Sequence, residues 1–313
     1  MNGSLAQDVR EGLSRRPRQL PPKYLYDELG SALFEAICAL PWYRVTRAET
    51  ALLSSCAQLV AGQIAGPPFI VELGPGSGGK LLRLAEAFDQ GPYKAHLHLV
   101  DISSSALAEA QQALARLEGF TVTVAHTTYD DGLAALGGVR PAAAPMLTLL
   151  LGSNIGNFDD EDALAFLRRV RAAGRDADWL LLGADLVKPE RDLVLAYDDP
   201  LGVTAAFNKN LLVRLNRELG ADFDLAAFDH RAVWNARHSR VEMHLVSRVP
   251  QRVHVPGADL AIAFEAGESI WTESSNKYTP ERIAGFAAGA GFSVRGQWVD
   301  AEAGFALNLL QAT

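Results

Sequence analysis

The chain has 313 residues, 49% of them hydrophobic and 21% charged, which excludes a disordered chain. Its length allows one large α/β domain, or a domain with a substantial insertion. The net charge of -8, with no basic block, argues against nucleic-acid binding. No stretch is apolar long enough to span a bilayer, the first residues do not resemble a targeting segment, and the two cysteines lack a pairing motif. We therefore expect a cytoplasmic protein that binds neither nucleic acid nor membrane.

The first two thirds of the chain predict a helical region followed by a sheet. Residues 1–62 show helical apolar spacing interrupted by prolines, which indicates a helical N-terminal cap. Residues 63–189 alternate between apolar strands and amphipathic helices, as a doubly wound, Rossmann-like α/β sheet does. The expected strands are 69–73, 95–101, 120–126, 146–151 and 178–184, and the expected helices are 78–88, 104–117 and 160–173.

The alternation stops after the last of these strands. Residues 190–278 predict an inserted α+β lobe for substrate, with one long helix at 191–219 and strand character at 240–247 and 260–264. Residues 279–313 then return to the sheet, with a helix at 280–290 and strands at 292–299 and 305–311.

A glycine-rich turn follows the first strand of the predicted sheet. Gly74, Gly76 and Gly78 let the backbone turn sharply and approach a ligand, and the next helix offers free N–H groups. Asp101 ends the next strand, where a carboxylate can accept both ribose hydroxyls. The pattern predicts a site for an adenosine cofactor. Glu72, just before the turn, favours S-adenosylmethionine over a nicotinamide, because nicotinamide enzymes usually have a small or apolar residue there.

Other polar segments allow two interpretations each. Asn157 either contacts substrate or caps the helix that begins near residue 160. Tyr197 lies in a helical stretch that is either a site or a solvated interfacial face. Glu273 is expected between a strand and a helix, where it either recognises a cationic or N–H-bearing ligand or belongs to a capping segment. His96 and His98 alternate along a strand without a third ligand, so we expect no metal site.

Nine segments together resemble the S-adenosylmethionine-dependent histidine Nα-methyltransferases of ergothioneine biosynthesis. The likeness runs almost from end to end of the chain. It is carried by residues 20–31, 40–47, 72–80, 152–157, 196–199, 202–208, 216–218, 221–224 and 272–275. It implies a class I methyltransferase fold, S-adenosyl-L-methionine as cofactor and L-histidine as substrate, and it favours the functional interpretations of Asn157, Tyr197 and Glu273.

The resemblance also implies roles for individual residues. Those matched to the cofactor are Gly74, Gly76, Lys80, Asp101, Thr128 and Tyr129. Those matched to the substrate are Tyr43, Asn157, Tyr197, Glu273, Ser274 and Ser275. Asn157 and Tyr197 would bind the substrate carboxylate, whereas Tyr43, Glu273 and Ser275 would recognise the imidazole. Tyr26 would lie near the amino group and act as the catalytic residue.

Two positions depart from the family pattern. Thr128 stands where the family commonly has an acidic residue near the adenine amine, and Arg44 stands where it often has a second tyrosine. The implied reaction is trimethylation of the α-amine of histidine to give hercynine, by a monomer that acts on a small molecule. The alternatives are an N-methyltransferase for another amino acid such as a tryptophan derivative, a dehydrogenase, and a catalytically silent binding subunit.

Overall fold

The computed structural model describes residues 5–91 and 93–313, so the first four residues of the predicted cap lie outside it. The chain forms two compact units. The core unit consists of Val45–Val187 and Lys277–Thr313, and the insert unit consists of the residues up to Arg44 with Lys188–Asn276. None of the helices within the described ranges is long and apolar enough to cross a bilayer.

The core unit contains a seven-stranded sheet in the order β12-β13-β6-β5-β2-β3-β4. Its strands are β2 (Phe69–Leu73), β3 (His96–Asp101), β4 (Thr121–His126), β5 (Met146–Leu150), β6 (Trp179–Asp185), β12 (Phe292–Asp300) and β13 (Phe305–Ala312). The first five are parallel and β13 is antiparallel to both neighbours. This confirms the α/β, Rossmann-like class. Strand order reverses at β2, where the glycine turn begins, and ligands bind at such switch points.

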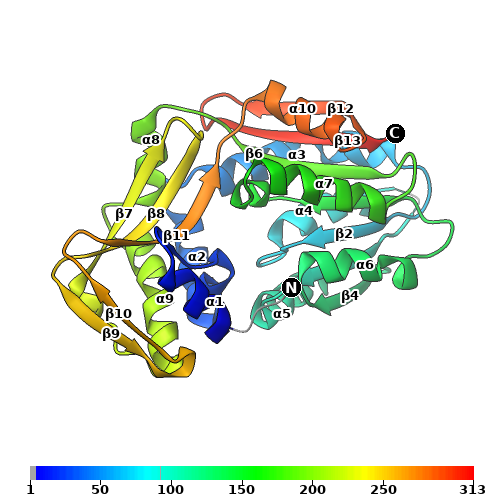
Figure 1. The fold of residues 1–313 in the computed structure, drawn as a ribbon. Helices are drawn as coiled ribbons and strands as arrows, with labels where there is room; N and C mark the ends of the chain where they lie inside the picture. Colours follow the sequence, from blue (N-terminus) through cyan, green and yellow to red (C-terminus); the bar gives the residue numbers. More distant parts are fainter. Residues whose placement is uncertain (1–4, 92) are drawn as a thin grey trace. The chain divides into compact units, whose positions relative to one another are not determined.

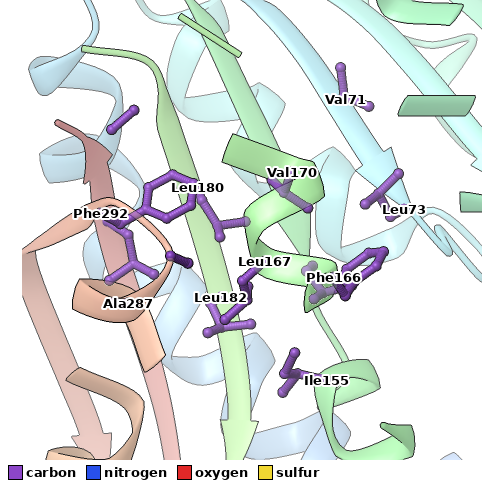
Figure 2. Packing of buried hydrophobic residues seen from close by; sticks show 14 of the residues in the cluster. Val71, Leu73, Ile155, Phe166, Leu167, Val170, Leu180, Leu182, Ala287 and Phe292 are labelled. Atoms are coloured by element: carbon purple, nitrogen blue, oxygen red, sulfur yellow. The ribbon is translucent and has the colours of Figure 1, made fainter. Parts of the chain in front are cut away.

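Helices cover both faces of this sheet (Figure 1). They are α3 (Val45–Gln63), α4 (Gly79–Asp89), α5 (Ser104–Leu114), α6 (Tyr129–Val139), α7 (Asp160–Ala173) and α10 (Pro280–Gly289). The helices α6, α7 and α10 pack on one face, and α3, α4 and α5 pack on the other. Figure 2 shows Phe166 and Leu167 of α7 with Leu180 and Leu182 of β6 in the first of these cores.

The helix α6 is absent from our sequence prediction, which passes from the strand at 120–126 to the strand at 146–151. Its three glycines weaken the helical pattern. Two signals were nevertheless present: Thr128 caps the helix by accepting the N–H of Asp131, and Leu133 and Leu136 recur at helical spacing on the buried face.

The insert unit contains a four-stranded sheet in the order β1-β11-β8-β7 and a hairpin of β9 and β10. These strands are β1 (Arg18–Gln19), β7 (Phe228–Asn235), β8 (Arg240–Ser247), β9 (Gln251–Val255), β10 (Leu260–Phe264) and β11 (Ser269–Asn276). Its helices are α1 (Leu5–Ser14), η1 (Pro22–Leu25), α2 (Glu28–Ala39), α8 (Glu190–Tyr197) and α9 (Val203–Leu219).

The units divide the chain differently from the predicted segments. We separated a cap at 1–62 from an insert at 190–278, whereas the insert unit contains residues from both. The reason is strand pairing: β1, near the N-terminus, pairs in parallel with β11. Helix α3, which we assigned to the cap, packs instead into the core of the larger sheet.

The single helix expected at 191–219 is wrong, because the chain breaks between α8 and α9. Pro200 cannot donate a backbone hydrogen bond, and the carboxylate of Asp199 accepts the N–H groups of Leu201, Val203 and Thr204 at 2.8–3.2 Å. These bonds outweigh the effect of burial and lower the pKa of Asp199. The break makes Tyr197 the last residue of α8.

Candidate active site

The glycine turn of the core unit adopts backbone conformations that favour glycine. Gly74 has φ +78° and Gly78 has φ +77°. A Cβ atom on Gly74 would overlap the Tyr129 hydroxyl and lie 2.9 Å from Asn154 Nδ2, and one on Gly78 would lie 2.8 Å from Ala110 Cα. The Gly74 N–H donates to the carbonyl of Val100 at 2.9 Å, which ties the turn to the end of β3. The turn is therefore tied to β3, and neither Gly74 nor Gly78 has room for a side chain.

Glu72 places an ionisable group inside the sheet just before this turn. Its side chain is buried, and its Oε2 atom has no hydrogen-bond partner among the described residues. Burial raises its pKa to about 8, since the attraction of Lys80 only partly offsets it and the charges of Glu49 and Asp101 add to it. An unsatisfied buried acceptor favours a ligand that brings a donor or a positive charge.

Asp101, Thr128 and Tyr129 lie where the strands β3 and β4 lead into their helices. The Asp101 carboxylate accepts the N–H of Ser103 at 2.8 Å, and burial raises its pKa. The Thr128 hydroxyl donates to Asp131 at 2.8 Å while capping α6. The Tyr129 hydroxyl accepts a long hydrogen bond, 3.5 Å, from Asn154. Thr128 thus has a structural task in addition to the contact expected of it.

Sequence reasoning missed Glu49, whose carboxylate is completely buried on α3. Both of its oxygens accept the N–H of Gly152, at 2.9 and 2.8 Å, and Oε2 lies 2.6 Å from the Lys80 ammonium. A signal was available: Glu49 occupies an otherwise apolar stripe of α3 that includes Val45 and Leu53. An acid in such a stripe indicates a buried partner.

The segment from Gly152 to Asn157 is tied down at several points. Ser153, at φ +59°, accepts the N–H of Asp185 at 2.9 Å, and the Tyr278 hydroxyl donates to the carbonyl of Ile155 at 3.0 Å. A non-glycine residue persists in this conformation only where its surroundings enforce it. Asn157 is exposed at the end of the short helix η2 (Asn154–Asn157). The alternative that Asn157 caps α7 is wrong, because Asp159 is the cap.

In the insert unit, β11 contains Glu273, Ser274 and Ser275, where we expected a connecting stretch. A β-bulge at Thr272 changes the phase of side chains: Trp271 pairs with His244, but Glu273 pairs with Met243 on the opposite face of the sheet. Ser275 shares the face of Glu273, and both are buried. Ser274 lies opposite Glu242 on the other face. The structure therefore brings Glu273 and Ser275 together and directs Ser274 away from them.

Three predicted substrate residues and the predicted catalytic Tyr26 gather within the insert unit. The Tyr197 hydroxyl donates to Ser275 Oγ at 2.8 Å. The rings of Tyr197 and Tyr43 lie 6.1 Å apart, and Phe34 links Tyr43 at 6.3 Å to Tyr26 at 5.6 Å. These edge-to-face contacts are favourable, and they hold the rings of three tyrosines in one aromatic cluster.

A second set of hydrogen bonds fixes the end of α8 at its backbone. His230 Nε2 lies 2.7 Å from the carbonyl of Tyr197, and Asn208 Nδ2 lies 2.9 Å from His230 Nδ1. An amide nitrogen only donates, so His230 accepts at Nδ1 and donates from Nε2 as the neutral tautomer. Burial lowers the pKa of His230, which maintains that state. Neither His230 nor Asn208 was singled out from the sequence.

No group of three or more His, Cys, Asp or Glu side chains within residues 5–91 and 93–313 could hold a metal ion. His96 and His98 both contact the Thr123 hydroxyl, at 2.8 and 2.9 Å, and burial lowers the pKa of each.

Comparison with known proteins identifies the family. The sequence model of the family described as "Histidine-specific methyltransferase, SAM-dependent" matches residues 5–312. The chain belongs to the histidine-specific, S-adenosylmethionine-dependent methyltransferases. A relative in this family, the histidine N-alpha-methyltransferase of Mycolicibacterium smegmatis, is 39% identical over 98% of this chain and 94% of its own. That of Mycobacterium tuberculosis is 38% identical over the same shares.

A more distant relative acts on a different amine. The 4-dimethylallyltryptophan N-methyltransferase easF of Epichloe festucae var. lolii is 26% identical over 95% of this chain and 92% of its own.

The core unit of this methyltransferase fits S-adenosylmethionine, the family's cofactor. The cofactor has a sulfonium, an ammonium and a carboxylate. The orphaned oxygen of Glu72 can accept from a cationic donor, and Lys80 can attract the carboxylate. The backbone of Gly74 is covered on its Cβ side by Tyr129 and Asn154, which places the polar groups of these two residues beside the turn.

Proposed function

We propose that this methyltransferase transfers three methyl groups to the α-amino group of L-histidine and produces Nα,Nα,Nα-trimethylhistidine, or hercynine, in the first step of ergothioneine biosynthesis. The observation that carries the proposal is the match of the histidine-specific family over residues 5–312. The polar groups of the insert unit support it, because they suit a small ligand with both donors and acceptors.

Recognition of the imidazole is assigned to Tyr43, Glu273 and Ser275. A neutral imidazole has one N–H donor and one acceptor nitrogen, and a carboxylate with a hydroxyl can satisfy both. An indole has only a donor, so it would leave a polar group unmatched. Such a mismatch costs about 1–3 kcal/mol, or about one to two decades of selectivity. The side chain of Ser274 faces the other side of the sheet, and we assign it no role in recognition.

The carboxylate of histidine is assigned to Asn157 and Tyr197. Both side chains can donate without carrying a charge: the Asn157 amide has N–H donors, and the Tyr197 O–H, which donates to Ser275 in the structure, would turn to the carboxylate and accept from Ser275 instead. The pair of hydroxyls would then connect carboxylate recognition with imidazole recognition.

The chain's part in the reaction is to position and desolvate a neutral amine. When bound, S-adenosylmethionine would supply the methyl group of its sulfonium and leave as S-adenosylhomocysteine, while the amine gives up one proton to solvent for each methyl group it gains. Tyr26, packed edge-on against Phe34 and Phe207, is held in a defined orientation from which its hydroxyl would hydrogen-bond the amine and orient the lone pair. Excluding water from such a site removes a competing partner of the amine nitrogen.

We infer further that the protein is a cytoplasmic monomer that acts on a small molecule and engages neither nucleic acid nor membrane. The net charge of -8 supports this inference. Light scattering of the purified chain tests the monomer.

A panel of histidine analogues tests the proposed function. Initial rates are compared for L-histidine, histamine (which lacks the carboxylate), imidazolepropionate (which lacks the amine) and L-tryptophan. We expect turnover of L-histidine, slow turnover of histamine, and none of imidazolepropionate or tryptophan. Turnover of imidazolepropionate would contradict methylation at the α-amine, and preferred turnover of tryptophan would support the alternative substrate class.

The catalytic assignment of Tyr26 has its own test. Tyr26→Phe keeps the ring contacts and removes the hydroxyl, so we expect slower methylation with little change in cofactor binding. An unchanged rate for all three methylations would refute the role.

A further inference from the structure

The Glu49 carboxylate is an unusual group for the core of the sheet. It lies in the apolar stripe of α3 and has no exposed surface. A charge taken out of water is costly unless other groups compensate for it. Both compensating partners, the Lys80 ammonium and the Gly152 amide, belong to segments that flank the glycine turn.

These segments meet the turn from two directions. Lys80 is the second residue of α4, which begins directly after the turn. Gly152 opens the segment that contains Asn154, and Asn154 lies against the face of Gly74 where no Cβ fits. Gly152 itself has φ +73°, and a Cβ there would lie 3.3 Å from Lys80 Nζ. Through one carboxylate, Glu49 therefore fixes both segments with respect to the turn.

The charges around the turn indicate which end of the cofactor is concerned. The cation that acts on buried Glu72 is Lys80, while Glu49 and Asp101 contribute negative charge. S-adenosylmethionine has one anionic group, the carboxylate of its amino-acid end. The Lys80 ammonium and the N-terminal end of α4, the positive end of the helix dipole, have the sign to receive it.

We propose that Glu49 is a positioning residue for the amino-acid end of the cofactor. It anchors the Lys80 ammonium and the Gly152 amide, so that Lys80 meets the cofactor carboxylate without first having to be ordered. This inference depends on the use of S-adenosylmethionine and not on which amine is methylated.

The variant Glu49→Gln tests the proposal because it changes charge with almost no change of volume. A glutamine oxygen in the place of Oε2 keeps acceptors for Lys80 and Gly152, whereas its amide nitrogen replaces Oε1, the second acceptor of the Gly152 N–H. Two ligands are titrated by calorimetry without histidine or any other methyl-accepting substrate. They are S-adenosylhomocysteine and 5′-methylthioadenosine, which lacks the amino-acid end.

We expect the variant to bind S-adenosylhomocysteine at least about tenfold more weakly, the size of one charge-assisted contact. Its affinity for methylthioadenosine should stay within about twofold of the unchanged chain, since no charged group of that ligand meets Lys80. General damage to the fold would weaken both ligands alike, so the ratio of the two affinities separates positioning from structural support.

Two further variants sharpen the result. Glu86→Gln is the matched control, because Glu86 is an exposed acid on α4 that pairs with Arg116 at 2.8 Å, and we expect no change for either ligand. In a Lys80→Met background, Glu49→Gln should weaken S-adenosylhomocysteine by less than about twofold more, because the group it positions is gone.

Three outcomes would overturn the proposal. Equal weakening of both ligands would show a structural role alone. Unchanged binding of S-adenosylhomocysteine would show that the ion pair of Glu49 with Lys80 does not affect cofactor binding. Tighter binding would show that Glu49 competes with the cofactor for Lys80. None of these results depends on histidine, so they are distinct from a failure of the proposed function.

Discussion

The polar groups beside the glycine turn of the core unit differ in charge from those beside Tyr197 in the insert unit. The core unit buries full charges in pairs, as in Lys80 with Glu49 at 2.6 Å and Lys277 with Asp185 at 2.8 Å. Near Tyr197 in the insert unit, the polar groups are hydroxyl, amide and imidazole groups, with the carboxylate of Glu273 beside Ser275 on the same face of β11. A charged cofactor suits the first kind of surface, whereas a small substrate whose amine must be neutral to react suits the second.

The contrast also predicts different tolerance to substitution. Breaking a buried ion pair leaves a charge without compensation and costs about 3–5 kcal/mol. Removing a neutral hydrogen bond typically costs about 0.5–1.5 kcal/mol. Variants that break an ion pair of the core unit should therefore lose more stability than variants that remove one neutral hydrogen bond of the insert unit.

The largest effect is expected from Gly74→Ala. The residue has φ +78°, and its new Cβ would overlap the Tyr129 hydroxyl. Affinity for S-adenosylhomocysteine, measured by calorimetry, should fall by at least about 100-fold. Gly62→Ala, where a Cβ meets nothing within 4 Å, is the control and should leave the affinity unchanged. Retained affinity in Gly74→Ala would mean that the turn does not approach the cofactor.

Glu72 should make stability depend on pH. Its pKa is raised from 4.5 to about 8, so between these values the folded chain holds a proton that the unfolded chain has released. Stability from this group is therefore present below about pH 4.5 and is lost as pH rises through 8. The difference in unfolding free energy between the unchanged chain and Glu72→Gln should change by on the order of 3 kcal/mol from pH 5 to pH 8. If the difference in unfolding free energy between the unchanged chain and Glu72→Gln were the same at every pH, the buried, neutral carboxyl would be contradicted.

Glu273→Ala tests whether the polar groups of the insert unit bind histidine and not the cofactor. We expect the KM for histidine to rise by about 30-fold, because the imidazole loses a charge-assisted hydrogen bond. The affinity for S-adenosylhomocysteine should be unchanged. Glu265→Ala, an exposed acid that follows β10, is the control. Equal losses for substrate and cofactor would indicate a role of Glu273 in folding.

The smallest effect is expected from Tyr197→Phe, which removes the donor to Ser275 and leaves the ring contact with Tyr43. The KM for histidine should rise by about fivefold, as for one neutral hydrogen bond. A double-mutant cycle with Ser275→Ala should give less than the sum of the single effects. Additive effects would show that the two hydroxyls act on the substrate independently.

The sequence predicted the core unit better than the insert unit, for physical reasons. Buried parallel strands are continuous apolar runs, and the glycine turn with Glu72 and Asp101 is a local signal, so both were readable. The bulge at Thr272 and the pairing of β1 with β11 depend on contacts between distant parts of the chain, which local patterns do not encode.

Glu49 and α6 were missed for a different reason. Each had a local signal that a stronger pattern hid: an acid within an apolar stripe for Glu49, and the capping Thr128 before a glycine-rich helix for α6. The bond between Tyr197 and Ser275 joins α8 to β11, residues far apart in the chain, and only the fold reveals it.

Mass spectrometry of the reaction products is the most direct test of whether the protein trimethylates L-histidine. Purified protein is incubated with S-adenosylmethionine and either L-histidine or L-tryptophan, and additions of one, two and three methyl groups are measured. We predict trimethylated histidine and unmodified tryptophan. Methylated tryptophan with unmodified histidine would contradict the assignment of the insert unit's polar groups to imidazole, and no product from either amino acid would contradict the proposed function.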